Sequence, residues 1–376
     1  MQLEQRRWNA GQGWNQPSAM NRAQLVLVFG SPSALCDSGR LGELRTSYPG
    51  STLFGCSTAG EICGVQVTDE SLVATAIRFQ GTTFRTALSS VAETSESFAA
   101  GTRLAEALGT AGLTHLFVLS DGLRINGTEL VRGLTEHLPA SVSITGGLAG
   151  DGARFKSTWV LADGKPASGM VAALGFYGSH LKVGCASLGG WDPFGPDRLI
   201  TRSKGNVLYE LDGKSALDLY KQYLGEHSKE LPASGLLFPL SLRTKGSATR
   251  VVRTILAVDE ADQSMSFAGD VPEGAHAQLM KANFDRLIEG ATGAARTSLG
   301  AGLASSPDFA ILVSCVGRKL VLKQRIEEEV EGVREVVGDR TVLAGFYSYG
   351  EISPFTPGGR CELHNQTMTI TTLSER

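Results

Sequence analysis

The sequence predicts an α/β protein, of the mixed α+β kind, in which mixed sheets are covered by helices and the chain forms two domains. Two observations support this class. Short apolar runs typical of buried strands alternate with amphipathic helical stretches. A spacing of 91 residues separates Leu25 from Leu116, and the same spacing separates the turn glycines Gly55 and Gly146. Such an internal period is typical of a duplicated unit, here of the order strand-helix-strand-hairpin.

The composition indicates a globular protein and argues against several partners. The chain has 376 residues and a formal net charge of -3, which does not fit the basic surface that nucleic-acid binding needs. No apolar run reaches the roughly 18 residues of a membrane-spanning helix, and the N-terminus lacks the apolar core of a signal peptide. We therefore expect a cytosolic protein that binds neither nucleic acid nor membrane. Six cysteines without a C-x-x-C pair predict neither a disulfide framework nor a zinc site.

The first half of the chain shows the repeated unit twice. Residues 1–22 are polar and predict an extended arm ahead of a first domain, residues 23–188. The first unit is predicted to contain a strand at 23–29, a helix at 38–47, a strand ending at Phe54 and a hairpin over 63–79. The second is predicted to contain a strand at 115–119, a helix at 128–138, a strand at 142–145 and a hairpin over 157–176.

The second half is predicted to repeat the unit twice more. Residues 189–196 are dense in Gly and Pro and predict a linker, because neither a helix nor a central strand continues through such a stretch. The second domain is then residues 197–376. Val207 lies 91 residues after Leu116, and another apolar strand begins at Phe309. We therefore expect four related units, paired into two domains.

The last predicted helix carries one apolar stripe. Ile326, Val330, Val333 and Val337 recur at helical spacing and predict a buried face. The acidic run 327–329 beside this stripe is therefore expected to form the solvated face of the helix.

Two related motifs lie near the two ends of the chain. Residues 55–62 and 345–352 share the pattern Gly-x-x-hydroxyl-x-Gly-Glu-Ile. Turns bounded by glycine let main-chain N–H groups approach a ligand closely, and Glu61 or Glu351 could orient an amine. The alternative is that each acid hydrogen-bonds its own turn.

A third turn resembles these two. In residues 146–151 the tripeptide Ala149-Gly150-Asp151 aligns with Ala59-Gly60-Glu61. Asp151 is therefore predicted to share a polar site with the two glutamates.

Other residues of these motifs complete the candidate site. Cys56 could be a nucleophile, although activation of a thiol needs a nearby base that the spacing does not show, and a buried structural thiol is the alternative. Tyr347 and Tyr349 alternate along the chain and could line a flat apolar ligand or pack in the core. The candidate ligand-binding residues are Cys56, Ser57, Thr58, Glu61, Asp151, Tyr347, Tyr349, Glu351 and Asn365.

Taken together, these motifs resemble the FIST family, named for F-box and intracellular signal transduction proteins. The resemblance rests on residues 55–62, 146–151, 206–213, 345–352 and 363–368. It covers nearly the whole chain and implies an N-terminal and a C-terminal FIST domain. It also implies a sensory module for a small ligand, for which amino acids or their relatives are proposed.

The chain ends at Arg376, directly after the predicted closing strand, so the output is expected to pass to a separate protein. This arrangement is similar to that of stand-alone FIST proteins that bind haem and report nitric oxide to a partner histidine kinase. The lead expectation is therefore a non-catalytic, haem-based nitric oxide sensor that regulates a separate histidine kinase and could form a homodimer. One alternative is a FIST sensor for an amino-acid-like small molecule. The other is an enzyme with Cys56 as its nucleophile.

If haem binds, a histidine is the expected axial ligand, because imidazole binds ferrous iron without adding a negative charge. His364 is the first candidate, since it lies in the closing strand, close in sequence to Tyr347 and Tyr349. His180, in the apolar strand region before the linker, is the alternate.

Overall fold

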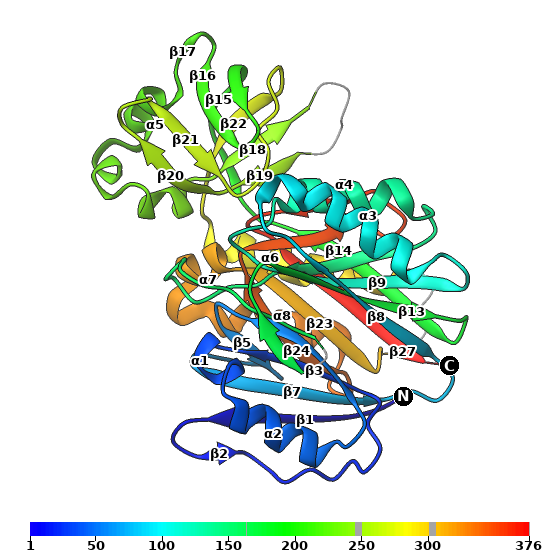
Figure 1. Ribbon diagram of the computed structural model, residues 1–376. Helices are drawn as coiled ribbons and strands as arrows, with labels where there is room; N and C mark the ends of the chain where they lie inside the picture. The colour runs from blue at the N-terminus through cyan, green and yellow to red at the C-terminus, as the bar shows by residue number, and fades with distance from the viewer. Residues whose placement is uncertain (163, 245–249, 301–305, 376) are drawn as a thin grey trace.

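Three mixed sheets with helices on their outer faces form a body, and one further sheet forms a module that projects from it (Figure 1). The computed structural model describes residues 1–162, 164–244, 250–300 and 306–375, so Arg376 lies outside it. The predicted α/β class with mixed sheets is confirmed. In Figure 1 the module, residues 192–281, is the green and yellow part above the body.

The body consists of three units. The first contains β1 (Gln2–Asn9), β2 (Gly13–Trp14), β3 (Leu25–Gly30), α1 (Pro32–Leu35), α2 (Ser38–Ser47), β4 (Thr52–Ser57), β5 (Glu61–Cys63), β6 (Gln66–Thr68) and β7 (Ser71–Arg78). The second contains β8 (Thr83–Ser90), η1 (Thr94–Glu96), α3 (Ser97–Leu108), β9 (Leu113–Ser120), α4 (Gly127–His137), β10 (Ser143–Leu148), β11 (Val160–Ala162), β12 (Lys165–Ala167) and β13 (Met170–Tyr177).

The third unit begins before the module and resumes after it. It contains β14 (Leu181–Leu188), α6 (Phe284–Leu299), β23 (Phe309–Cys315), α7 (Val316–Leu322), η4 (Lys323–Arg325), α8 (Ile326–Val337), β24 (Val342–Ser348), β25 (Gly350–Pro354), β26 (Cys361–His364) and β27 (Met368–Glu375).

The module has its own sheet and core. It contains β15 (Asp192–Lys204), β16 (Val207–Leu211), β17 (Lys214–Ser215), α5 (Ala216–Leu224), η2 (Gly225–Glu230), η3 (Ala233–Leu237), β18 (Leu240–Arg243), β19 (Val251–Arg253), β20 (Ile255–Asp259), β21 (Ser264–Phe267) and β22 (His276–Lys281). Leu208, Leu217, Met265 and Phe267 are buried in one cluster at its centre.

The three body sheets have the same strand pattern. In each, a parallel pair (β3–β4, β9–β10 or β23–β24) is flanked by an antiparallel strand from its own unit (β7, β13 or β27) and then by a further strand (β1, β8 or β14), which in the first sheet is followed by another, β2. The other flank is a hairpin from a different unit. The hairpin β5–β6 adds to β24, β11–β12 adds to β4, and β25–β26 adds to β10. The units therefore exchange hairpins in a closed cycle.

A glycine in the second strand of each parallel pair supports this equivalence. Gly55, Gly146 and Gly345 lie opposite Val28, Val118 and Leu312 in the parallel register. A Cβ atom on each glycine would lie only 1.7, 1.8 and 1.9 Å from the carbonyl oxygen of its partner. The same close approach of two main chains thus occurs three times, and only glycine permits it.

The three sheets enclose a shared apolar core. Alternate residues of the first strand of each pair point into one cluster, which includes Leu27, Phe29, Phe117, Ile311 and Val313. The intervening residues pack against the outer helices. Both faces of each sheet are therefore buried, which explains why these strands read as continuous apolar runs.

The number of units and the domain boundaries differ from the prediction. There are three units and not four, because the segment at Val207 belongs to the module sheet, which lacks a parallel pair in the described residues. Residues 189–196 are not a linker throughout, since β15 begins at Asp192. The expected second domain, residues 197–376, is therefore split between the module and the third unit.

The N-terminal segment also differs from the expected arm. β1 pairs with β7 along its whole length, from Gln2 opposite Arg78 to Asn9 opposite Ser71. It occupies the same place as the edge strands β8 and β14. Two strands of the first sheet, β1 and β2, therefore lie within residues 1–22.

The helix α8 has the predicted buried stripe, but one acid of its acidic run is not solvated. Glu329 is fully buried. Its carboxylate pairs with Arg318, at 2.7 Å from Nη2, and accepts hydrogen bonds from Tyr347 and Ser314. A cation and two hydroxyl groups thus satisfy a charge that would otherwise be costly to bury.

Candidate functional site

The two glutamates of the related motifs occupy equivalent turns. Glu61 accepts hydrogen bonds from the Thr58 hydroxyl, from Ser71 N at 3.1 Å and from Ser71 Oγ at 2.6 Å. Its carboxylate therefore ties the turn after β4 to the first residue of β7.

Glu351 repeats these contacts in the third unit. Its carboxylate accepts hydrogen bonds from Ser348 Oγ at 2.8 Å, from Thr367 N at 3.1 Å and from Thr367 Oγ1 at 2.9 Å. The two acids thus perform the same local task, which is to hold a hairpin against the strand that follows it.

Both carboxyl groups are buried without a cationic hydrogen-bond partner. Burial raises the pKa of Glu61 to about 7, although the hydrogen bonds from Ser71 and Thr58 oppose the rise. Burial likewise raises the pKa of Glu351 to about 8, against hydrogen bonds from Ser348 and Thr367. Near neutral pH both the protonated and the ionised form of each acid are therefore present, because burial disfavours the ionised form.

Asp151 does not occupy the equivalent position. The residue opposite Cys56 across the hairpin pairing is Val160, whereas Glu61 and Glu351 fill the same place in the other two sheets. In the second unit the turn that leads to this position is longer. Asp151 lies within the extra loop, so the alignment of its tripeptide with residues 59–61 is wrong.

The Asp151 carboxylate caps that loop. Its Oδ1 accepts from Phe155 N at 2.8 Å, and its Oδ2 accepts from Lys156 N at 2.8 Å and Ser157 N at 2.9 Å. The Tyr349 hydroxyl also donates to it. The charge is therefore used to fix main-chain N–H groups in place.

The three turns close around each other at the centre of the body. The bonds run from Ala59 N to Tyr347 O (2.8 Å), from Gly150 N to Ser57 O (2.9 Å) and from Tyr349 N to Leu148 O (3.1 Å). Main-chain groups that were expected to face a ligand thus bond to one another. The described residues leave this centre closed.

Cys56, Ser57 and Thr58 are part of this closed centre. Burial raises the pKa of the Cys56 thiol well above its usual value. The Ser57 hydroxyl accepts a hydrogen bond from Trp159 N at 2.8 Å, and the Thr58 hydroxyl donates to Glu61. A thiol that is buried and protonated is a poor nucleophile.

The two tyrosines have different surroundings. The Tyr347 hydroxyl donates to Glu329 at 2.7 Å and its ring is fully buried. The Tyr349 ring lies parallel to the ring of Phe155, with centroids 4.4 Å apart and an angle of 15° between the planes. They do not wall one common pocket with His364.

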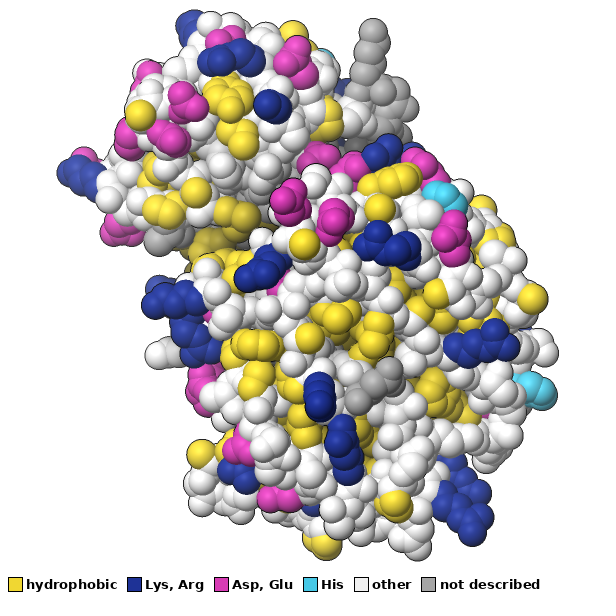
Figure 2. Space-filling model, in the orientation of Figure 1, with side chains coloured by type: hydrophobic (Ala, Val, Ile, Leu, Met, Phe, Trp, Pro, Cys, Tyr) yellow, Lys and Arg dark blue, Asp and Glu magenta, His cyan; other side chains and the backbone are white. Residues whose placement is uncertain are grey.

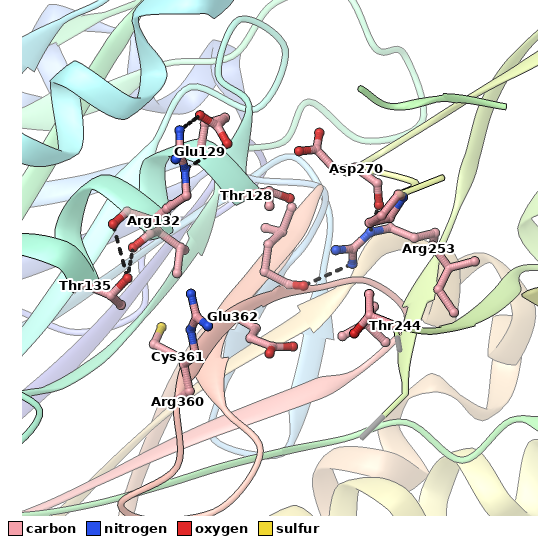
Figure 3. Close-up of a pocket in the computed structure, with 15 residues that line it drawn as sticks. Thr128, Glu129, Arg132, Thr135, Thr244, Arg253, Asp270, Arg360, Cys361 and Glu362 are labelled. Atoms are coloured by element: carbon pink, nitrogen blue, oxygen red, sulfur yellow. Dashed lines mark hydrogen bonds and ion pairs between the residues drawn. The ribbon is translucent and has the colours of Figure 1, made fainter. Parts of the chain in front are cut away.

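A charged cavity lies elsewhere, between the module and the body (Figure 3). Its volume is about 330 Å³. Helix α4, the β26 segment, and the module residues around β19 and Asp270 supply its walls. Figure 2 shows the crease between module and body, with acidic and basic side chains close together along part of it. The charged lining residues are Glu129, Arg132, Arg253, Asp270, Arg360 and Glu362.

Arg253 is the most unusual of these residues. Its side chain is 5% exposed, yet its described hydrogen bonds all go to carbonyl oxygens: Asp270 O at 3.1 Å, Val252 O at 3.2 Å and Leu363 O at 3.0 Å. No described carboxylate forms an ion pair with it. Burial lowers its pKa to about 10, which the nearby charges of Asp270 and Glu362 oppose. The guanidinium group keeps its charge at neutral pH without a paired anion.

The acidic side of the cavity is only partly neutralised. Glu129 forms an ion pair with Arg132, with the closest atoms 2.6 Å apart. Asp270 instead accepts a hydrogen bond from the Asn126 carboxamide at 3.0 Å. Asn126 also caps the N-terminus of α4 through Thr128 N and Glu129 N. The cap of a body helix is therefore joined to the module wall of the cavity.

Comparison with family sequences decides the identity of the chain. The FIST N domain matches residues 24–214 and the FIST C domain matches residues 216–354. The chain belongs to the FIST family. FIST domains are sensor domains of signal-transduction proteins that bind small ligands. The FIST N match ends at residue 214 and the FIST C match begins at residue 216. This border lies inside the module, at β17, and not between the module and the body.

Other comparisons add little to the FIST assignment. No curated protein matches the chain. A solved structure, a cyanuric acid hydrolase from A. caulinodans, is similar with a TM-score of 0.33 and 8% identity, over 100% of this chain and 99% of that one. No helix in the described part of the FIST chain has the length and apolar character needed to cross a membrane.

The His364 ring is buried and hydrogen-bonded through one of its two nitrogens in this structure. The His364 ring is 1% exposed, and its Nε2 donates to Ser353 O at 2.7 Å. The ring of Phe355 meets it edge-on at 4.2 Å. Burial lowers the pKa of His364 to about 4, so the ring is neutral. Among the described residues, the module–body cavity is not lined by a histidine.

The remaining two candidates also lie apart from the cavity. His180 is exposed in the turn between β13 and β14, beside Gly81. Asn365 is buried in the turn after β26, and neither polar atom of its carboxamide has a partner among the described residues. Neither residue lines the charged cavity.

Sequence reasoning missed the residues that line the cavity. Arg253, Asp270 and Glu362 carry no common motif and come from separate parts of the chain. The only local signal was indirect, since Glu362 stands next to the motif at 363–368. Their convergence depends on how the module packs against the body.

Proposed function

We propose that the protein is a FIST sensor whose ligand is a small zwitterion of the amino-acid type, bound in the cavity between the module and the body. The observation that carries this proposal is the Arg253 guanidinium group, which is buried at the cavity wall without a paired anion. A buried cation of this kind gains most from a ligand carboxylate, because charge-assisted bonds are strong where water is excluded.

The other lining groups fit the opposite end of such a ligand. Asp270 and Glu362 lie close enough to Arg253 to raise its pKa, so two acids accompany the unpaired cation in a lining that also holds the Glu129–Arg132 pair and Arg360. A ligand ammonium group would be attracted to the acids while its carboxylate pairs with the guanidinium. A volume of about 330 Å³ is at the small end of known ligand pockets, which suits a metabolite of this size.

A ligand bound in this cavity would contact both the module and the body. Arg253 belongs to the module, and its bond to Leu363 O reaches the body. A ligand carboxylate that pairs with Arg253 changes the strength of the Arg253–Leu363 O hydrogen bond. The preferred position of the module changes with it. We propose that a separate signalling protein, for which a histidine kinase remains the expectation, recognises this position.

Haem-based sensing of nitric oxide is the less supported alternative. For His364 to bind iron through Nε2, its bond to Ser353 O would have to break, and Phe355 would have to move. The protein purified from haem-supplemented cells should therefore show no Soret band. A Soret band that His364→Ala removes would overturn the zwitterion proposal in favour of haem.

We also propose that the protein is not an enzyme of the Cys56 type. The thiol lies in the closed centre, and burial holds its pKa high. Alkylation of the folded protein should leave Cys56 unmodified while the exposed Cys36 reacts.

A thermal-shift screen with matched analogues tests the ligand class. We expect at least one free amino acid to raise the melting temperature, and we expect its amide and its N-acetyl derivative to have much weaker effects. The reason is that each derivative lacks one of the two charges that the cavity pairs. Loss of one charge-assisted bond corresponds to about 2 kcal/mol, or roughly a thirtyfold weaker affinity.

Variants place the effect in the cavity. Arg253→Gln and Asp270→Asn should both abolish the shift, and Asp270→Asn keeps an oxygen acceptor for Asn126. Arg202→Gln is the matched control, because Arg202 pairs with Glu210 on the module surface, away from the cavity. If the amide and the free amino acid stabilise the protein equally, or if the two cavity variants respond like the control, the proposal fails.

A further inference from the structure

A second cavity lies at the junction of module and body, and its lining differs in kind from the first. Its volume is about 410 Å³. The loop after β9, the extra loop of the second unit and Tyr349 line the body side, and residues near β20 and β21 line the module side. None of the described lining residues is Asp, Glu, Lys, Arg or His. The Asn126–Asp270 hydrogen bond joins a residue that lines this cavity to one that lines the charged cavity.

The extra loop of the second unit builds one wall of this cavity. Leu161 lies 15 residues after Gly146, whereas its equivalent Ile62 lies only 7 residues after Gly55. The second unit therefore carries eight additional residues at this turn. In a body whose three sheets share one strand pattern, this addition places Phe155 in the cavity wall.

Phe155 is held in an unfavourable backbone conformation. Its φ angle is +52°, a region that a bulky side chain rarely adopts. Asp151 holds it there by accepting from Phe155 N, and the Tyr349 ring supports one face of the Phe155 ring. The side chain is nevertheless 38% exposed, so an aromatic face is presented to the cavity. Local strain of this kind is a feature of ligand-binding sites.

Exposed apolar side chains gather at the same place. Of the six large apolar residues that are exposed in the described chain, Leu123, Phe155 and Leu256 all line this cavity. Leu123 and Phe155 come from the body, and Leu256 comes from the edge strand β20 of the module. Exposed apolar groups that converge from separate elements mark a binding site rather than chance exposure.

We propose that this cavity is a second ligand site, which takes an uncharged, planar aromatic molecule stacked on the free face of Phe155. The Phe155 and Tyr349 rings already form a parallel pair at 4.4 Å, and the ligand ring extends that stack. Leu256 covers the ligand from the module side. An ionised ligand is disfavoured because no charged side chain is present to replace its water.

Titration calorimetry with indole tests the second site. Wild-type protein should bind indole, and the anionic relative indole-3-carboxylate should bind at least tenfold more weakly. Phe155→Asn should raise the Kd for indole by about tenfold, since Asn tolerates the positive φ angle but removes the stacked ring. Leu256→Gln should weaken binding to a similar extent without disturbing the core, because Leu256 is 45% exposed.

Two controls make the outcome decisive. Leu88→Gln changes an equally exposed leucine on β8, outside this cavity, and should bind indole like the wild type. The thermal shift given by the free amino acid should be unchanged in Phe155→Asn, so failure of the zwitterion site and failure of this site are distinguished. Absence of indole binding, equal affinity for the anion, or equal affinity in either cavity variant and the Leu88 variant would overturn the proposal.

Discussion

The buried glutamates show how a residue that suggests a ligand site can serve the fold instead. Glu61 and Glu351 lie in related motifs and make equivalent hydrogen bonds in equivalent turns. Their carboxylates accept hydrogen bonds from hydroxyl and main-chain donors of their own unit. We therefore expect Gln at either position to change stability more than ligand binding.

Replacement of Glu351 by Gln should flatten the dependence of stability on pH. The pKa of this group is about 8 in the folded protein and about 4.5 when unfolded, so between these values the folded state binds more protons. The free energy of unfolding therefore falls as pH rises from about 4.5 to about 8. Glu351→Gln removes this contribution, which we expect to be on the order of 4 kcal/mol across that interval.

Denaturant unfolding at pH 5 and pH 8 measures this effect. Glu335→Gln, on the exposed face of α8, is the control and should keep the wild-type pH dependence. If the free energy of unfolding falls equally between pH 5 and pH 8 in the wild type and in Glu351→Gln, the carboxyl group has an ordinary pKa.

At the residue scale, the sequence pointed to the polar residues of the motifs but not to the burial or the partners of individual side chains. Glu329 reads as part of a solvated acidic run, yet its helical position beside Val330 brings it to Arg318. His115 begins an apolar run in the sequence, yet its ring is fully buried and lies within hydrogen-bond distance of Ser143 and Thr145. In both cases the deciding partner lies in another element, so local spacing could not reveal it.

The glycine-mediated approach of paired strands is the feature that defines the repeated element. Gly55→Ala should destabilise the protein by more than about 3 kcal/mol, because the new Cβ would lie 1.7 Å from Val28 O and the main chains would have to separate. Chemical denaturation measures this loss.

Gly42→Ala is the matched control. Gly42 lies in the exposed part of α2, and a Cβ there would contact nothing within 4 Å. This substitution should raise stability by about 0.5–1 kcal/mol, since alanine is a better helix former. If the two alanine variants have similar stabilities, the close approach of the strands is not a structural requirement.

At the element scale, the 91-residue period correctly related the first two units. It failed beyond them because the module is inserted into the third unit, between β14 and α6, so the strand at Val207 has the expected spacing but belongs to the module. The third unit resumes with α6 and β23. The exchange of hairpins between units was also beyond reach, since each hairpin is adjacent in sequence to one sheet and pairs with another.

At the scale of the whole molecule, the module and the body together form the walls of both cavities. At the centre of the body the three motif turns bond to one another through main-chain groups. The charged and the apolar cavity both arise where the module meets the body, on either side of the Asn126–Asp270 contact. No property of either part alone would have predicted these sites.

The central claim is that the ligand binds between module and body and not at the motif turns. Hydrogen–deuterium exchange with and without the amino acid that gives the largest thermal shift tests it most directly. The account predicts slower exchange in segments 251–253, 268–271 and 360–363, with unchanged exchange in residues 55–62 and 345–352. Slower exchange confined to those two motifs, with the module segments unaffected, would contradict it.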